Sequence, residues 1–208
     1  MVILVHVWSE LWYSWRHQIN PLACAGFRVV ARPRQWPFRT QFMPGNYSIS
    51  GDAASDDNGL TGREDGGLLE ILTDPEVFLN CMTAADLDYF VDQFSASGFR
   101  SPLNRYRNQD RDHEMLPQIG RARITQPACF IAGSKDMVRN LVPGHDLYAT
   151  PDAICDDLRI AEIIEGKGHW IQQEAPEEVN AHLLVSVRTG LRRMKIFQHD
   201  MAFCYFGE

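Results

Sequence analysis

An acidic residue and a histidine each follow a short apolar run in the C-terminal half of the sequence. Asp136 comes soon after the run 129–132, and His169 comes soon after the run 158–164. A histidine that is oriented by an acid can take a proton from water near neutral pH, which is the acid–base part of nucleophilic hydrolysis. The same spacing also fits a surface acid and a loop histidine that never meet. Both interpretations are open at this point.

Residues 2–5 and 129–132 are expected to be buried strands, and residues 27–31 and 158–164 to be two further strands of the same parallel sheet. Short apolar and β-branched runs are typical of such strands, and an order of strand, helix, strand implies a parallel sheet covered by helices. Ligands bind beyond the carboxyl ends of these strands, so we expect Asp136 and His169 at one edge of the sheet. The sequence therefore predicts an α/β fold with strands over residues 2–5, 27–31, 129–132 and 158–164, and a helix over residues 11–25.

Two further helices have recognisable ends. Thr83 is expected to cap a helix that runs to residue 97, with Asp86 three residues later as the second member of a capping box and Gly98 as its end. Pro176 is expected in the first turn of another helix, where the two glutamates that follow it complement the helix dipole.

Composition and charge exclude several classes of protein. The net charge of −7 over 208 residues argues against binding to nucleic acid or to an anionic membrane. The apolar opening at residues 2–5 is far shorter than the ~18 residues of a membrane span and lacks the basic lead of a signal peptide, so a cytoplasmic protein is expected. Five cysteines without a CxxC pair argue against a disulfide framework and a zinc site, so no metal is expected.

The predicted organisation has three parts. Residues 1–67 are expected to form the N-terminal part of the core and an irregular linker, because residues 32–67 are rich first in proline and then in glycine and acidic residues. Residues 68–120 are expected to form a helical lid, and residues 121–208 the C-terminal part of the core. The segment after Gly190 is basic and then aromatic, and it matches no element that we can predict.

Longer stretches of the sequence are specific enough to indicate a family. They read Glu-Leu-Trp-Tyr-Ser-Trp-Arg-His-Gln at 10–18, Gly-Phe-Arg-Ser-Pro-Leu-Asn-Arg-Tyr-Arg-Asn at 98–108, Gly-His-Trp-Ile-Gln-Gln-Glu at 168–174 and Pro-Glu-Glu-Val-Asn at 176–180. These stretches resemble the epoxide hydrolases of the α/β-hydrolase fold. The resemblance covers residues 2–31 and about 82–187, in the order of the family.

The resemblance implies a two-step mechanism and a role for each of three residues. An Asp carboxylate opens the epoxide to give a covalent ester, and a histidine-activated water then hydrolyses the ester to the diol. Tyr106 matches the lid tyrosine that donates to the epoxide oxygen, His169 the general base, and Asp136 the acid that orients it. The implied substrate is a small apolar epoxide, and the mechanism needs no cofactor.

The oxyanion motif of the family is present in altered form. The family has His-Gly-Phe-Pro-Glu after its first strand, and residues 6–10 read His-Val-Trp-Ser-Glu. The resemblance assigns the backbone N–H of Trp8 to the oxyanion hole. Val7 stands where a glycine allows a tight turn and Ser9 where a proline fixes the backbone, so a misshapen hole is expected.

No stretch of the sequence matches the nucleophile elbow of the family, Gly-His-Asp-Trp-Gly. Only about fifty residues separate Ala31 from Met82, where the family has the nucleophile strand, its helix, another strand and part of the lid. Asp52 has small residues two positions before and after it, which the elbow requires, but a poor strand precedes it. The letters Gly-His-Asp at 144–146 copy the motif by chance, since Pro143 directly precedes them.

The expected protein is therefore a truncated or internally deleted member, an incomplete α/β-hydrolase with a mostly parallel sheet flanked by helices and a remnant helical lid. Missing strands are expected to expose sheet edges, which a second copy of the chain could cover. Epoxide hydrolysis is expected to be weak or absent. The alternatives are a non-catalytic binding or assembly protein, and another hydrolase activity such as haloalkane dehalogenation. Tyr106 argues against dehalogenation, because a halide needs no phenol donor.

Overall fold

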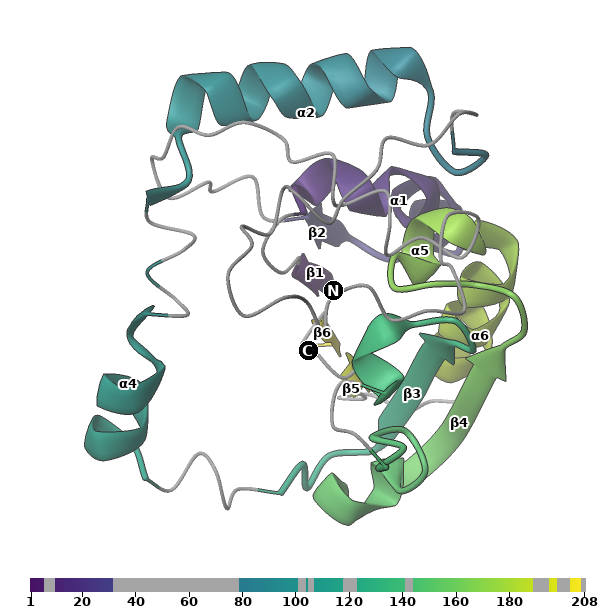
Figure 1. Cartoon of the computed structure of the whole chain (residues 1–208). Coiled ribbons are helices and arrows are strands. Elements are labelled where there is room, and N and C mark those ends of the chain that lie inside the picture. Colours follow the sequence, from purple (N-terminus) through teal and green to yellow (C-terminus); the bar gives the residue numbers. More distant parts are fainter. Residues whose placement is uncertain are drawn as a thin grey trace.

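The described part of the chain forms one six-stranded sheet with helices around it (Figure 1). The computed structural model describes residues 1–5, 10–31, 79–100, 104, 107–117, 123–140, 144–188, 195–197 and 203–206. The strands are β1 (Val2–Val5), β2 (Val29–Ala31), β3 (Ala128–Gly133), β4 (Leu158–Ile164), β5 (Lys195–Phe197) and β6 (Phe203–Phe206). The four strands predicted from the sequence are confirmed, with boundaries that differ by one or two residues.

The sheet consists of two parallel pairs joined by the C-terminal segment. The strand order is β2-β1-β6-β5-β3-β4. β1 is parallel to β2, and β3 is parallel to both β4 and β5. β6 is antiparallel to β1 and to β5. The sheet is thus mostly parallel, as predicted, and the protein has the incomplete α/β-hydrolase fold expected for it.

The two strands of the C-terminal segment were not predicted. β6 pairs with all four residues of β1, from Val2 opposite Phe206 to Val5 opposite Phe203. β5 pairs with the first half of β3, up to Phe130 opposite Phe197. The inner edges of β1 and β3, which the sequence predicts to be exposed, are therefore paired within the chain. Pairing of two copies through a sheet edge stays a prediction, and the outer strands left for it are β2 and β4.

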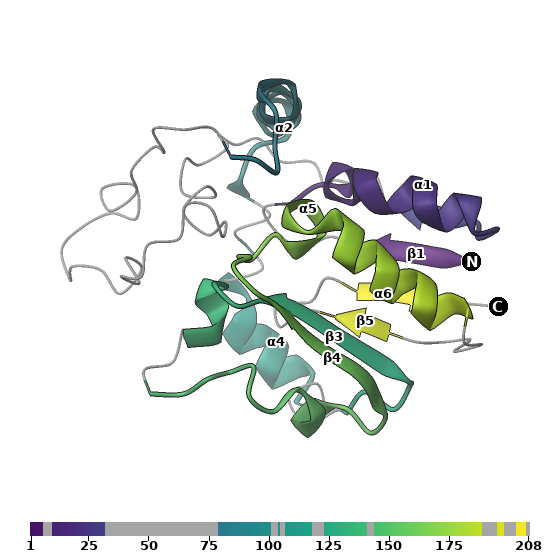
Figure 2. The ribbon, with the colours of Figure 1, turned by 90° about the vertical axis from the view of Figure 1, so that its right-hand side faces the viewer.

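One face of the sheet is covered by two helices that lie side by side. They are α1 (Arg16–Cys24) and α6 (Pro176–Arg188), with the short helix α5 (Ile171–Glu174) before α6 (Figure 2). The helix predicted from residue 11 begins instead as a single 3₁₀ turn at Trp12–Trp15 that leads into α1. The core on this face consists of Val2, Leu4, Trp15, Leu22, Cys129, Ile131, Ile171, Ala175, Val179 and Leu183.

β3 is buried along its whole length, which explains its uninterrupted apolar sequence. All six of its residues are buried, because side chains on both faces contact a core. Cys129 and Ile131 belong to the core beneath α1 and α6. The alternate residues Ala128, Phe130 and Ala132 pack on the opposite side with Val138, Tyr148 and Cys155.

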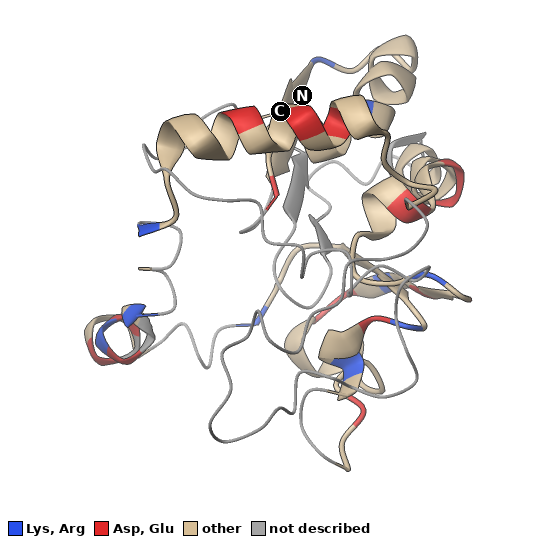
Figure 3. Ribbon diagram, turned by 45° about the horizontal axis from the view of Figure 1, so that its top comes forward, with Lys and Arg blue, Asp and Glu red and all other residues tan. Residues whose placement is uncertain are grey.

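Two more helices lie away from the sheet. α2 (Ala84–Ser97) begins with the predicted capping box, in which the Thr83 hydroxyl accepts from the Asp86 N–H and the Asp86 carboxylate accepts from the Thr83 N–H and hydroxyl. Gly98 ends it with a φ of 78°. The charged residues of α2 are all acidic (Figure 3). The other helix, α4 (Gln109–Met115), is short, and its part in a lid stays a prediction.

No helix in the described ranges is both long and apolar enough to cross a membrane. The division of the chain at residues 67 and 120 also stays a prediction. The strands at the two ends of the chain nevertheless share one sheet, so the predicted N-terminal and C-terminal parts of the core form a single layer.

Candidate active site

Asp136 and His169 meet at the carboxyl ends of β3 and β4. Both carboxylate oxygens of Asp136 lie 3.0 Å from His169 Nδ1. Asp136 is 1% exposed and His169 is 7% exposed. The prediction that they lie within hydrogen-bonding distance is confirmed, and its cause is the sheet, because β3 and β4 are neighbouring parallel strands that end at the same edge.

The loops that carry the two residues are joined through their backbones. The Ser134 N–H donates to the Ile164 carbonyl at 3.0 Å, and the Lys135 N–H donates to the Lys167 carbonyl at 2.8 Å. The Gly166 N–H donates in turn to the Ser134 hydroxyl at 2.8 Å. The loop after β3 thus fixes the loop after β4, and this contact sets the separation of Asp136 and His169.

This contact requires a glycine at the end of β3. A Cβ on Gly133 would lie 2.1 Å from the Lys167 carbonyl oxygen and 2.3 Å from that of Gly168. Both are backbone atoms directly before His169, so a side chain at position 133 would displace the histidine loop.

Gly133→Ala is therefore expected to destabilise the protein by on the order of 3 kcal/mol, since the backbone of the histidine loop must move. Urea unfolding measures the loss. Gly144→Ala is the control: a Cβ there meets nothing within 4 Å, and its φ of +76° costs only about 1–2 kcal/mol. Equal losses in the two variants would contradict the close approach at Gly133.

Two further donors to the Asp136 carboxylate lie in the part of the chain that the structure describes. Tyr148 Oη donates to Oδ2 at 2.7 Å, and the Val138 N–H donates to Oδ1 at 2.9 Å. Burial alone would raise the pKa of Asp136, but the hydrogen bonds from His169, Tyr148 and Val138 and the charge of the imidazolium hold it below the usual value. Asp136 is therefore ionised at neutral pH, and the stability that it contributes is lost as the pH falls through this lowered pKa.

Sequence reasoning did not find Tyr148. Its side chain is 4% exposed and packs edge-on against Phe130 of β3, with the ring centroids 5.3 Å apart. Its N–H donates to Asp146, whose carboxylate also binds the Arg139 guanidinium at 2.7 Å. Asp146 thus supports the Tyr148 loop, and the Gly-His-Asp letters at 144–146 have this structural role instead of a catalytic one.

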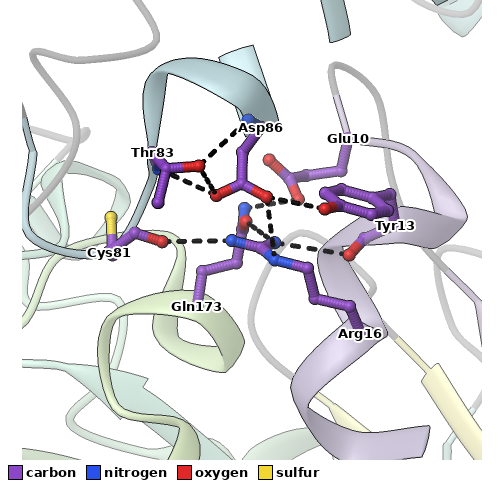
Figure 4. A network of polar contacts seen from close by, with 7 residues as sticks. All are labelled: Glu10, Tyr13, Arg16, Cys81, Thr83, Asp86 and Gln173. Atoms are coloured by element: carbon purple, nitrogen blue, oxygen red, sulfur yellow. Dashed lines mark hydrogen bonds and ion pairs between the residues drawn. The ribbon is translucent and has the colours of Figure 1, made fainter. Parts of the chain in front are cut away.

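A second polar network lies at the other side of the histidine loop (Figure 4). Gln173 of α5 donates to Glu10 Oε2 at 2.9 Å and accepts from Arg16 Nη1 at 2.6 Å. Arg16 also forms an ion pair with Asp86 of α2 at 3.4 Å, and Asp86 accepts from Tyr13 Oη at 2.7 Å. The network therefore connects α1, α2 and α5, and it holds α2 to the core.

Glu10 is the buried carboxyl of this network. Burial raises its pKa from 4.5 to about 8, although the charge of Arg16 opposes the shift; the charge of Glu174 adds to it. The folded protein thus keeps Glu10 protonated at a pH where the unfolded chain releases the proton. Stability falls as the pH rises from about 4.5 to about 8, at a cost on the order of 3 kcal/mol at pH 7.

Glu10→Gln is expected to raise the free energy of unfolding at pH 8 by on the order of 4 kcal/mol, because it removes the cost of keeping a proton while retaining an acceptor for Gln173. At pH 4 the gain is expected to disappear. Urea unfolding at the two pH values measures it, with the exposed Glu177→Gln as the control. A Glu10→Gln variant that is destabilised at pH 8 would contradict a protonated Glu10.

Three predicted site residues lie outside the described residues. They are Trp8 of the oxyanion motif, Asp52 as the nucleophile candidate and Tyr106 of the lid. The predicted projection of Tyr106 towards His169 lies outside them too. Their roles stay predictions. Among the residues that the structure describes, no cluster of three or more His, Cys, Asp or Glu side chains could hold a metal ion.

The known proteins to which this chain is similar are named as epoxide hydrolases. No family model matches it. Epoxide hydrolase B of Mycobacterium tuberculosis is 40% identical over 119 residues, which are 57% of this chain and 32% of that protein. Bifunctional epoxide hydrolase 2 of Rattus norvegicus is 32% identical over 146 residues, 68% of this chain and 26% of that protein. The chain thus spans about a third or less of the length of these curated relatives.

Solved structures show the same fold. An epoxide hydrolase from an endophytic Streptomyces superposes with a TM-score of 0.73 at 24% identity, over 95% of this chain and 91% of that one. Epoxide hydrolase A from Mycobacterium thermoresistibile gives a TM-score of 0.69 at 23% identity, over 89% of this chain and 90% of that one. These structural similarities support the α/β-hydrolase fold that the sequence predicts.

Proposed function

We propose that this chain, which belongs to the epoxide hydrolase family, hydrolyses a small apolar epoxide with His169 as the general base and Asp136 as the acid that orients it. The observation that carries the proposal is the buried Asp136–His169 pair at the carboxyl edge of two parallel strands. An ionised carboxylate at Nδ1 orients the ring and stabilises the imidazolium, and Nε2 is the ring nitrogen that we propose takes the proton from water.

The proposed reaction has two steps. An Asp carboxylate oxygen attacks an epoxide carbon, the carbon–oxygen bond of the ring breaks, and the released oxygen takes a proton from the Tyr106 hydroxyl. His169 then removes a proton from water, whose oxygen adds to the carbonyl carbon of the ester. The ester C–O bond breaks, and the departing diol oxygen takes a proton from the His169 imidazolium. The restored carboxyl group gives up the remaining proton, which returns to the Tyr106 phenolate. Trp8 is proposed to stabilise the negative oxygen of the second step through its backbone N–H.

Tyr148 is not a substitute for Tyr106 in this scheme. Its hydroxyl donates to Asp136, and its side chain is buried against Phe130. A buried phenol that donates its proton to the Asp136 carboxylate is not placed to donate it to an epoxide oxygen. We therefore assign Tyr148 to holding Asp136 in place.

The sequence offers a second candidate for the nucleophile besides Asp52. β5 is parallel to β3, so it runs toward the edge of the sheet at which β3 leads to Asp136, and it ends at Phe197. β6 is antiparallel to β5 and begins at Phe203. The five residues that join these strands in the sequence read Gln-His-Asp-Met-Ala at 198–202 and share His-Asp with the elbow of the family. Asp200 lies outside the described residues and enters the proposal on this sequence pattern alone.

The nucleophile can be identified by trapping the ester. His169→Gln is expected to block the second step, so that incubation with a styrene-type epoxide adds the mass of one epoxide to the protein. Peptide mapping then locates the adduct at Asp52 or Asp200, and Asn at the labelled position is expected to abolish it. Turnover by the wild type without any adduct in His169→Gln would contradict the covalent step and favour direct attack by water.

We also propose that the protein is cytoplasmic. The described cysteines at positions 24, 81, 129 and 155 are free thiols, which suits a reducing compartment.

A further inference from the structure

We propose that Glu174 is a positioning residue that fixes the backbone on both sides of His169. The proposal rests on the proposed function only for the role that it gives to His169. Glu174 is the last residue of α5, five positions after the histidine. Neither the sequence pattern nor the family mechanism described above assigns it a part in the chemistry.

The carboxylate of Glu174 binds the two amides that flank the histidine. Oε2 accepts from the Gly168 N–H at 2.7 Å, and Oε1 accepts from the Trp170 N–H at 3.0 Å. Hydrogen bonds to an ionised carboxylate are stronger than those between neutral groups. One side chain therefore restrains the Lys167–Gly168 and the His169–Trp170 peptide groups, and His169 lies on the short stretch of backbone between them.

Glu174 is itself held in place by the turn that follows the histidine. Its N–H donates to the Trp170 carbonyl at 2.9 Å, and the Gln173 N–H donates to the same carbonyl at 2.8 Å. The Gln173 side chain connects this turn to the buried Glu10. The turn thus holds the Glu174 carboxylate in a fixed position relative to the loop that it binds.

The two anchors of His169 have different effects. Asp136 fixes the ring through Nδ1, and Glu174 fixes the backbone from which the ring projects. With the ring anchor alone, the loop could shift and carry the Nε2 atom of the ring away from the water that it must activate. A displacement of about 1 Å is enough to lower a rate on the order of a hundredfold.

The protonation of the neighbouring Glu10 agrees with a charged Glu174. Burial and the charge of Glu174 favour the protonated form of Glu10, so its pKa is raised while Arg16 opposes the shift. The negative charge of Glu174 is thus one of the two causes that keep the proton on the buried Glu10. Only the ionised form of Glu174 can accept both amides with two equivalent oxygens.

Glu174→Gln tests the proposal, because it keeps the shape of the side chain but turns one acceptor oxygen into an NH₂ donor. One of the two amide bonds must then be lost. We expect amide hydrogen exchange at Gly168 and Trp170 to become about tenfold or more faster. We also expect the NMR signal of the His169 Nδ1 proton to shift or broaden. The control Glu177→Gln makes the same charge change at an exposed site on α6 and is expected to leave both readouts unchanged.

Wild-type exchange rates and an unchanged Nδ1 signal in a folded Glu174→Gln variant would overturn the proposal. If that variant does not fold, Glu174→Asp keeps the charge on a shorter side chain, and normal protection of both amides in it would overturn the proposal equally. Diol formation from styrene oxide separates this test from the proposed function. A wild type without turnover contradicts the function alone, whereas turnover in Glu174→Gln at the wild-type rate contradicts the positioning role alone.

Discussion

Removal of residues 191–208 is expected to make the chain aggregate. β5 and β6 supply all the strand pairing between the β2-β1 pair and the β3-β4 pair within the described sheet. Without them, every residue of β1 and the first half of β3 lose their backbone partners on one side. α1 and α6 would still pack together, but two exposed inner edges would be open to pairing with other chains.

Size-exclusion chromatography and urea unfolding measure this effect. The truncated chain is expected to elute as aggregates and to lose its cooperative unfolding transition. The control removes only Gly207 and Glu208, which follow β6, and is expected to behave like the full chain. A monomeric and cooperatively unfolding 1–190 chain would show that the sheet does not depend on its C-terminal strands.

Elements with local signals could be predicted from the sequence. β1 and β3 are continuous apolar runs of strand length, and β4 is an apolar run interrupted by Arg159 and Glu162. α2 has both its capping box and its terminal glycine within the sequence. These signals involve neighbouring residues only, so no tertiary information is needed to recognise them.

Elements that depend on distant partners could not be predicted. β5 has three residues and β6 has four, and each is a strand only because it lies between β1 and β3. Tyr148 has no motif that connects it to Asp136, and their contact depends on a loop closing onto β3. The need for Gly133 follows from the approach of another loop, which its own sequence context does not encode.

The candidate site was found by combining a general rule with a resemblance. The rule that parallel strands end at a common edge placed Asp136 and His169 together, and the family motif indicated what the pair does. The partners that hold the pair, Tyr148 and Glu174, come from hydrogen bonds that only the fold reveals. The sequence therefore predicted the contact between Asp136 and His169 but not the residues that hold them in place.

The central claim is that the Asp136–His169 pair serves hydrolysis of an epoxide. Diol formation from styrene oxide by the full chain and by His169→Gln tests it most directly, with the exposed His17→Gln as the control for loss of an imidazole. Turnover is expected to be slow in the wild type, unchanged in His17→Gln and reduced to the buffer rate in His169→Gln. Triad deletions in an efficient hydrolase cost on the order of a millionfold, so even a slow reaction leaves a measurable difference. A wild-type rate equal to that of buffer, or one that His169→Gln leaves unchanged, would contradict the claim.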